Sequence, residues 1–347
     1  MNHQLSSVID VRSDTVTKPT KEMLEAMMLA KVGDDVFGED ETVNALQEKA
    51  AHLFGMEAAL FCCSGTQTNQ IAIKVHTQPG DEVICSELAH IYLYEGGGIA
   101  FNSGASVRLL PGDRGRFTAQ KVIENINKKT DVHFALTRMV GVENTVNKGG
   151  GCCWDLNELK KIKAACTDNG LAFHLDGARL FNALIAKGEQ PAQYGNLFDT
   201  ISICLSKGLG APVGSLLLGT RSHIEKARRI RKVFGGGMRQ AGFLAAAGIY
   251  ALNYHVQRLS EDHDKAKSLE QLLLSQNYVE TVMPVETNVV IVKLRDAFPM
   301  EVFLTHLQNK GVKAVSMGKQ LIRFVMHLDI ESELFERLCT VLSAFKG

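Results

Sequence analysis

Short apolar runs alternate with amphipathic stretches along the chain as far as Arg239. From Thr42 to Phe54 the apolar residues recur at helical spacing and Gly55 follows, so the pattern predicts a helix that ends there. A second helix is predicted from Leu156 to Cys166, with Asp155 as its N-cap and Gly170 behind it. The apolar face of the first helix is predicted to consist of Val43, Leu46, Ala50 and Leu53.

The short apolar runs between the helices are predicted to be strands. They are Ala58 to Cys62, Glu82 to Cys85, Val107 to Leu110, Val132 to Leu136, Ala172 to Leu175, Thr200 to Leu205 and Ser215 to Leu218. Strands that alternate with helices predict an α/β fold with a mostly parallel central sheet. Because the loop between the last two runs is too short for a crossover helix, one strand is expected to be antiparallel.

Beyond Arg239 the pattern changes to two long helices followed by shorter elements. The helices are predicted at Ala241 to Tyr254, Arg258 to Leu274, Met300 to Asn309 and Ser332 to Phe345, and the strands at Val289 to Lys293 and Leu321 to Met326. This change predicts a smaller α+β C-terminal domain at 256–347 beside a large domain at 21–255. The N-terminal segment, 1–20, is expected to pack with the small domain.

Composition excludes several function classes. The chain of 347 residues has 38 basic and 38 acidic side chains and a formal net charge of +0, which gives no support to binding nucleic acid or an anionic membrane. No apolar run approaches the roughly 18 residues of a membrane span. Met1 to Asp14 has no basic region followed by an apolar one, so we expect a cytoplasmic protein without a secretory signal. The eight cysteines form no C-x-x-C motif and the eleven histidines show no ligand spacing, so no metal site is expected.

Three groups of candidate residues follow predicted strands, where open α/β sheets bind their ligands. Ser64-Gly65-Thr66 opens the helix that runs to His76, and it is either a phosphate site or simply a capped helix. Asp176 ends a strand and Arg179 follows; the carboxylate could hold a proton on a ring nitrogen, or the two could form a local ion pair. His90, with Tyr92, Tyr94 and Glu95 close behind, follows a third strand, although a lone histidine is more often structural.

Lys207 directly follows a strand of almost wholly apolar residues. Burial lowers the pKa of an amine and makes it a nucleophile toward carbonyl groups. The alternative is a nucleotide loop built on Gly208, Gly210 and Gly214, but Pro212 intrudes and a strand follows where a helix should begin. A lysine, a carboxylate, a phosphate-binding turn and a flat ring together fit pyridoxal 5′-phosphate.

Several long motifs resemble those of the low-specificity L-threonine aldolases, which are pyridoxal-phosphate enzymes of fold type I, the aspartate-aminotransferase-like fold. They are Asp10 to Thr17, Val32 to Val36, Ser64 to Thr66, Ala89-His90, Glu143 to Thr145, His174 to Arg179, Leu205 to Ser215 and Gly235 to Gln240. The resemblance runs almost end to end. It implies retro-aldol cleavage of L-threonine or L-allo-threonine to glycine and an aldehyde, by a homotetramer built as a dimer of dimers.

The resemblance also implies a role for each matching residue. Lys207 would carry the cofactor as a Schiff base, Asp176 would keep its pyridine nitrogen protonated, and His90 would stack on its ring. Because this chain lacks the histidine that the family commonly has after the Glu-Asn-Thr motif, His90 is also the leading candidate base. Gly65 and Thr66 would hold the phosphate, with Arg239 and Lys232 near it and reaching across from a neighbouring subunit, and Arg179 would also contact the cofactor. The substrate, and above all its carboxylate, would be bound by Ser13, Arg179, Arg323 and Tyr94.

One position departs from the family pattern. The family commonly has a histidine directly after the Glu-Asn-Thr motif, near the substrate hydroxyl, whereas this chain has Val146. A valine cannot accept a proton, so we expect Val146→His to change the ratio of threonine to allo-threonine cleaved, provided that Val146 lines the substrate pocket. Two alternatives stay open: a β-eliminating lyase that acts on another amino acid, and a non-enzymatic protein that has kept only the scaffold.

Overall fold

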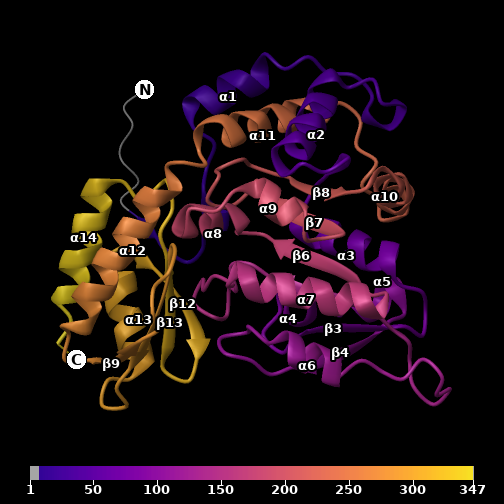
Figure 1. Ribbon diagram of the computed structural model, residues 1–347. Coiled ribbons are helices and arrows are strands. Elements are labelled where there is room, and N and C mark those ends of the chain that lie inside the picture. The colour runs from indigo at the N-terminus through magenta and orange to yellow at the C-terminus, as the bar shows by residue number, and fades with distance from the viewer. Residues whose placement is uncertain (1–7, 347) are drawn as a thin grey trace.

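The computed structural model describes residues 8–346 and has a seven-stranded sheet at the centre of its larger part (Figure 1). The order of the strands is β2-β8-β7-β6-β5-β3-β4. Their bounds are β2 (Ala58–Cys62), β3 (Glu82–Ser86), β4 (Ser106–Leu110), β5 (Thr137–Glu143), β6 (Ala172–Gly177), β7 (Thr200–Cys204) and β8 (Ser215–Gly219). β8 runs antiparallel to both of its neighbours and the other pairs are parallel, which confirms the predicted sheet with one antiparallel strand.

Helices cover both faces of this sheet (Figure 1). Their bounds are α1 (Lys21–Met28), α2 (Glu41–Phe54), α3 (Gly65–His76), α4 (His90–Leu93), α5 (Gly98–Ser103), α6 (Ala119–Glu124), α7 (Leu156–Asn169), α8 (Leu180–Lys187), α9 (Pro191–Gly195), α10 (Arg221–Val233) and α11 (Gly242–Tyr254). α2 ends at Gly55, which adopts φ 64°, a left-handed conformation that favours glycine. The predicted face of α2 needs one correction: Leu53 is 36% exposed, and the fully buried Phe54 packs into the core instead.

The prediction of a strand from Val132 to Leu136 is wrong. The side chain of Val132 is 94% exposed, and the segment forms a turn before β5. The strand begins at Thr137 and includes Arg138 and Gly141, which interrupt the apolar run that the sequence reasoning relied on. Because the alternate side chains of β5 still face the core, the strand forms without a continuous apolar sequence.

The C-terminal part contains a four-stranded antiparallel sheet of order β12-β13-β10-β9. Its elements are α12 (Leu259–Leu274), β9 (Val279–Val282), β10 (Val289–Leu294), α13 (Met300–Asn309), β12 (Val315–Gly318), β13 (Leu321–Val325) and α14 (Ser332–Ser343). In Figure 1, α12 and α14 lie on the side of this sheet that faces away from the large sheet. The extra antiparallel sheet agrees with the predicted α+β character.

The beginning of the described chain joins this C-terminal part. β1 (Ile9–Asp10) pairs in parallel with β11 (Val312–Lys313), and Ile9 and Val11 belong to the apolar cluster that the C-terminal helices and strands form. A larger apolar cluster fills the space around the seven-stranded sheet. Among residues 8–346 no helix is both long and apolar enough to span a membrane.

Candidate active site

The carboxyl ends of the parallel strands bring several of the predicted site residues, among them His90 and Asp176, to one edge of the large sheet. A cavity of about 200 Å³ there is lined by Gly65, Thr66 and Asp176, among others. A second cavity, of about 370 Å³, is lined by residues that include Ser13, Tyr94, Arg179 and Arg323. His90 and Lys207 line both cavities, so the amine and the imidazole lie where the two spaces meet. We refer to these spaces as the inner cavity and the outer cavity.

The first turn of α3 forms one wall of the inner cavity. Ser64 is the N-cap, and its side chain accepts a hydrogen bond from the backbone N–H of Gln67. A Cβ atom at Gly65 would lie 2.5 Å from Sγ of Cys204, so only glycine fits this close approach. Free backbone N–H groups and the positive end of the helix dipole make this turn suitable for an anion such as a phosphate.

Asp176 brings a buried carboxylate into the same cavity. Its side chain is 2% exposed, and Oδ1 accepts a hydrogen bond of 3.2 Å from the backbone N–H of Ala178. Oδ2 is buried and has no hydrogen-bond partner. An unpaired buried carboxylate oxygen is costly, so the site favours a ligand with a cationic N–H group, such as a protonated pyridine nitrogen.

Arg179 pairs with Asp14 and not with Asp176, so the alternative of a local Asp176–Arg179 ion pair is wrong. Nε and Nη2 of Arg179 donate to the two carboxylate oxygens of Asp14 at 2.8 and 2.6 Å, and both side chains are buried. Burial by itself would raise the pKa of Asp14, but the charge and hydrogen bonds of Arg179 lower it to about 2. The ion pair with Asp14 holds one edge of the Arg179 guanidinium in place, and Arg179 lines the outer cavity.

His90 is held by two carboxylates. Its backbone N–H donates to Oε2 of Glu143 at 2.9 Å, and Nδ1 of its ring lies 3.0 Å from Oε1 of Glu95. Burial acts to lower the pKa of His90, but the hydrogen bond with Glu95 and the charge of Asp176 outweigh it, so the pKa is raised. The Glu95 contact occupies Nδ1 and leaves Nε2 for a ligand. The ring of Tyr94 lies beside it, with the ring centroids 5.6 Å apart.

Glu143 is a buried carboxylic acid that titrates near neutrality. It accepts hydrogen bonds from the backbone N–H groups of His90 and Asn147. Burial and the neighbouring charge of Asp176 raise the pKa of Glu143 to about 7. A group with such a pKa can gain or lose a proton at physiological pH, and it lies directly behind His90.

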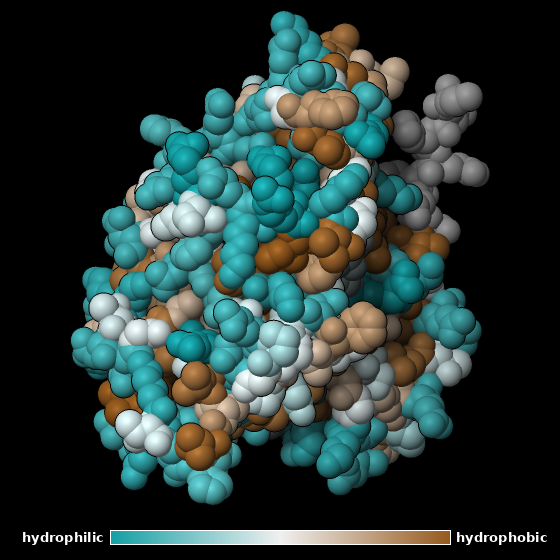
Figure 2. All heavy atoms as spheres, turned by 90° about the vertical axis from the view of Figure 1, so that its right-hand side faces the viewer, coloured by the Kyte–Doolittle hydropathy of each residue, from teal (hydrophilic) through white to brown (hydrophobic). Residues whose placement is uncertain are grey.

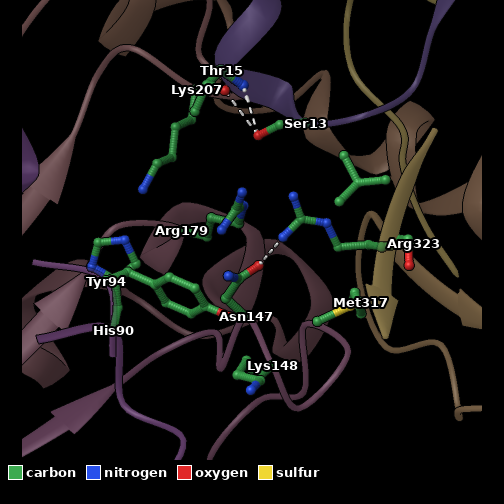
Figure 3. A pocket seen from close by; sticks show the side chains of 12 residues that line it. Ser13, Thr15, His90, Tyr94, Asn147, Lys148, Arg179, Lys207, Met317 and Arg323 are labelled. Carbon is green, nitrogen blue, oxygen red and sulfur yellow. Dashed lines mark hydrogen bonds between the residues drawn. The ribbon is translucent and has the colours of Figure 1, made fainter. Parts of the chain in front are cut away.

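Arg323 reaches the outer cavity from the C-terminal sheet. Its Nη1 donates to Oδ1 of Asn147 at 2.8 Å and its Nη2 donates to the backbone oxygen of Arg12 at 3.0 Å, while burial lowers the pKa of its guanidinium. Figure 3 shows the amine of Lys207 and the guanidinium groups of Arg179 and Arg323 pointing into one space. Several cations around a small cavity suit a small anionic group such as a carboxylate.

Two predicted phosphate ligands lie elsewhere within this single chain. Neither Arg239 nor Lys232 is among the residues that line the inner or the outer cavity. Nη1 of Arg239 donates to Asp34 at 2.8 Å, and its side chain is 54% exposed. Their role was expected to come from a neighbouring subunit, and it stays a prediction.

Val146 does not line the outer cavity, which corrects the expectation that was attached to it. Its side chain is 1% exposed and belongs to the large apolar cluster, with Gly115 and Cys152 as neighbours. Asn147 lines the cavity instead. A histidine at position 146 would therefore have to enter a packed core before it could reach a substrate.

Comparisons with known proteins identify the family. A family model described as beta-eliminating lyase matches residues 10–297. A low specificity L-threonine aldolase of Escherichia coli (strain K12) is 43% identical over 343 residues, which cover 97% of this chain and 99% of the relative. The low specificity L-threonine aldolase of Saccharomyces cerevisiae is 40% identical over 84% of this chain and 76% of its own length. The chain belongs to the low-specificity L-threonine aldolase family.

The solved structures agree on the fold. A threonine aldolase of Leishmania major has a TM-score of 0.82 at 22% identity, with 96% of this chain and 98% of that chain covered. A protein of Listeria monocytogenes described as a putative L-allo-threonine aldolase has a TM-score of 0.81 at 18% identity, over 98% and 97% of the two chains. Enzymes of the family are lyases that depend on pyridoxal phosphate, and the fold is pyridoxal-phosphate fold type I.

Sequence reasoning missed part of the site. Asp14 and Glu143 stand inside motifs that it singled out, but neither received a role, and Asn147 stands just beyond one of them. The signal for Asp14 was a carboxylate within the opening motif, which could neutralise the arginine of the His174 to Arg179 motif. The signal for Asn147 was weaker, since its contact with Arg323 joins positions 176 residues apart.

Proposed function

We propose that this protein catalyses the retro-aldol cleavage of L-threonine and L-allo-threonine to glycine and acetaldehyde, with pyridoxal phosphate bound in the inner cavity. The observation that carries the proposal is the placement of Lys207 and His90 between the two cavities. One cavity offers an anion-binding turn and the unpaired Oδ2 of Asp176, and the other offers guanidinium groups. The two cavities thus suit a phosphorylated ring and a small amino acid that meet at one amine.

Each residue then has a defined task. The amine of Lys207 would hold the cofactor covalently, Asp176 would accept a hydrogen bond from the pyridine N–H group, and Gly65 and Thr66 would donate to the phosphate. The chemistry that bound pyridoxal phosphate would supply is an acceptor for the electron pair left by the broken Cα–Cβ bond.

The remaining residues position the substrate. Arg323 and Arg179 bind its carboxylate, with Ser13 and Tyr94 beside them, and so set the orientation of the bond that breaks. His90 takes the proton of the β-hydroxyl group at Nε2, the ring nitrogen that Glu95 does not engage.

The test is to incubate the purified protein with each threonine isomer and assay acetaldehyde and glycine. Lys207→Ala should abolish cleavage, whereas the surface control Lys161→Ala should retain it. Cleavage by Lys207→Ala at the wild-type rate would refute the proposal. Release of ammonia and a keto acid, with no acetaldehyde, would instead support the β-eliminating alternative.

We further propose that the enzyme is a homotetramer in which a neighbouring subunit brings Arg239 and Lys232 to the phosphate. Val233 at the end of α10 is 82% exposed and Phe101 in α5 is 90% exposed. Figure 2 views the side of the molecule that carries these helices in Figure 1, and hydrophobic side chains gather there between hydrophilic ones. Exposed apolar side chains of this size support burial by a second copy. Light scattering should give four times the mass of one chain; a monomeric mass would contradict this.

We also propose a cytoplasmic location and a role in threonine catabolism and glycine biosynthesis. All eight cysteines are free thiols in the described chain, which supports a reducing compartment. The two main apolar clusters support a large domain at 21–255 and a small domain at 256–347 with which the N-terminal segment, 1–20, packs; residues 1–7 lie outside the described residues. Fractionation of cells that express the protein tests its location, because recovery of the enzyme from a secreted fraction would contradict the proposal.

A further inference from the structure

A chain of buried hydrogen bonds runs from His90 across the central sheet. Oε1 of Glu95 accepts from Nδ2 of Asn69 at 2.9 Å and also lies 3.0 Å from Nδ1 of His90. Oδ1 of Asn69 is 3.1 Å from Nε2 of His174, and Nδ1 of His174 is 2.9 Å from Oγ1 of Thr200. Asn69, His174 and Thr200 are almost fully buried, on α3, β6 and β7. The proposed reaction assigns no task to these three residues.

The donor and acceptor groups fix the direction of these hydrogen bonds. A carboxylate only accepts hydrogen bonds, so Asn69 turns its NH₂ group toward Glu95 and its oxygen toward His174. His174 must then donate from Nε2. Burial lowers the pKa of His174 to about 4, so at neutral pH the ring carries one proton and Nδ1 is left as an acceptor. The hydroxyl of Thr200 fits that acceptor as a donor, and its oxygen can accept in turn from Nε2 of His76, which lies 3.0 Å away.

A competing arrangement lies close by. The backbone oxygen of Thr200 is 3.2 Å from Nδ1 of His174 and would accept from it if that nitrogen carried the proton. Nε2 would then become an acceptor facing the oxygen of Asn69. Two acceptors cannot form a hydrogen bond, so the amide of Asn69 would have to flip and turn its NH₂ group toward His174. The flip would place the oxygen of Asn69 against Glu95. The hydroxyl of Thr200 therefore selects between two tautomers of His174.

We propose that Thr200 and His174 are positioning residues for His90, because they fix the amide of Asn69 with its NH₂ group toward Glu95 and so fix the carboxylate that holds the imidazole of His90. This inference rests on the proposed function, in which His90 receives the hydroxyl proton. His174 and Thr200 line neither cavity, whereas Asn69 lines the inner cavity and connects them to it.

Replacing Thr200 by valine keeps the volume of the side chain but removes the hydroxyl donor. His174 would move its proton to Nδ1, Asn69 would flip, and a carbonyl oxygen would replace an N–H group beside Glu95. The added negative potential favours the protonated form of His90, so its pKa rises. The other groups around His90 stay unchanged; they are Tyr94, Glu143, Asp176 and Lys207, with Arg179 and Arg323 across the outer cavity.

The test compares Thr200→Val with Thr200→Ser in the holoenzyme. We expect the acid limb of the pH profile of kcat/KM to move up by about one pH unit in Thr200→Val, the size expected for a changed hydrogen bond to a charged group. Thr200→Ser keeps the hydroxyl and should keep the wild-type profile. Thr137→Val is a matched control, because Thr137 is another buried threonine of the sheet. Its hydroxyl contacts Glu82, which is not part of the hydrogen-bond series from His90 to Thr200.

A second readout does not depend on activity. Long-range ¹H–¹⁵N NMR of ¹⁵N-histidine-labelled holoenzyme reports the tautomer of His174, whose signals are assigned by their loss in His174→Gln. Nε2 should carry the proton in the wild type and in Thr200→Ser, and Nδ1 should carry it in Thr200→Val. If Thr200→Val does not fold, Thr200→Cys, which donates only weakly, should shift both readouts in the same direction.

An unchanged acid limb in folded Thr200→Val, with the proton still on Nε2, would overturn the inference. So would an equal shift in Thr137→Val, because the effect would then be general to buried threonines of the sheet. Failure of the proposed function has a different signature, namely wild-type holoenzyme that releases no acetaldehyde. The NMR experiment would still decide the direction of the hydrogen-bond chain in that case.

Discussion

The buried pair of Asp14 and Arg179 permits a quantitative prediction. Asp14→Asn keeps the shape of the side chain but leaves the guanidinium without its counter-charge, in a place where both side chains are buried. The pKa of Asp14 falls from 3.8 to about 2, and this shift corresponds to roughly 2–3 kcal/mol at neutral pH. Loss of one partner of a buried pair typically costs about 3–5 kcal/mol. We therefore expect Asp14→Asn to lower the free energy of unfolding by about 3 kcal/mol.

Urea denaturation at pH 7 measures this loss, and Glu280→Gln is the control. Glu280 pairs with Lys293 at 2.8 Å, but both side chains are substantially exposed, so its removal should cost under about 1 kcal/mol. Because the pKa of Asp14 is lowered on folding, its contribution is present above pH 3.8 and is lost as the pH falls toward 2. A loss in Asp14→Asn no greater than that in Glu280→Gln would refute the reasoning.

Three further predictions follow from other contacts. Gly65→Ala should destabilise the protein by about 1–3 kcal/mol, because the new Cβ would lie 2.5 Å from Sγ of Cys204; the double variant with Cys204→Ala should recover most of this in urea unfolding. Asn147→Ala should raise KM for L-allo-threonine about tenfold with a smaller effect on kcat, because Arg323 loses its 2.8 Å partner, and steady-state kinetics measures both. Glu143→Gln should remove a pH dependence of stability, because the pKa of Glu143 is raised on folding from 4.5 to about 7, so its contribution is present below pH 4.5 and is lost as the pH rises through 7. Urea unfolding measured across this pH range should therefore give the wild type a steeper loss of stability than the variant, and curves of the same slope would contradict the prediction.

The fold was largely predictable because its elements are encoded locally. The caps of α2 and α7, the alternation of apolar and polar stretches, and the short loop before β8 all appear in the sequence itself. The strand β5 escaped prediction because Arg138 and Gly141 interrupt its apolar run. A more continuous apolar run just before it turned out to be an exposed turn.

The site was predictable only where one motif contains the whole chemistry. Lys207 and Asp176 can be recognised from the sequence because each is a charged residue at the end of an apolar run. By contrast, the partner of Arg179 stands 165 positions away, and the contact between His174 and Asn69 spans 105 positions. No local pattern encodes such pairs, because only the folded sheet brings them together.

The pairing of β1 with β11 has a consequence for synthesis on the ribosome. Arg323 donates to the backbone oxygen of Arg12 across 311 positions of sequence, so the outer cavity joins a segment that is made early to one that is made much later. Nascent chains emerge at about 5–20 residues per second and fold from the N-terminal side. The large sheet can therefore form on the ribosome, while the opening segment waits for β11 and β13. A chain that has not been synthesised as far as β13 lacks Arg323, so the ability to bind a substrate carboxylate arises only after β13 has been made.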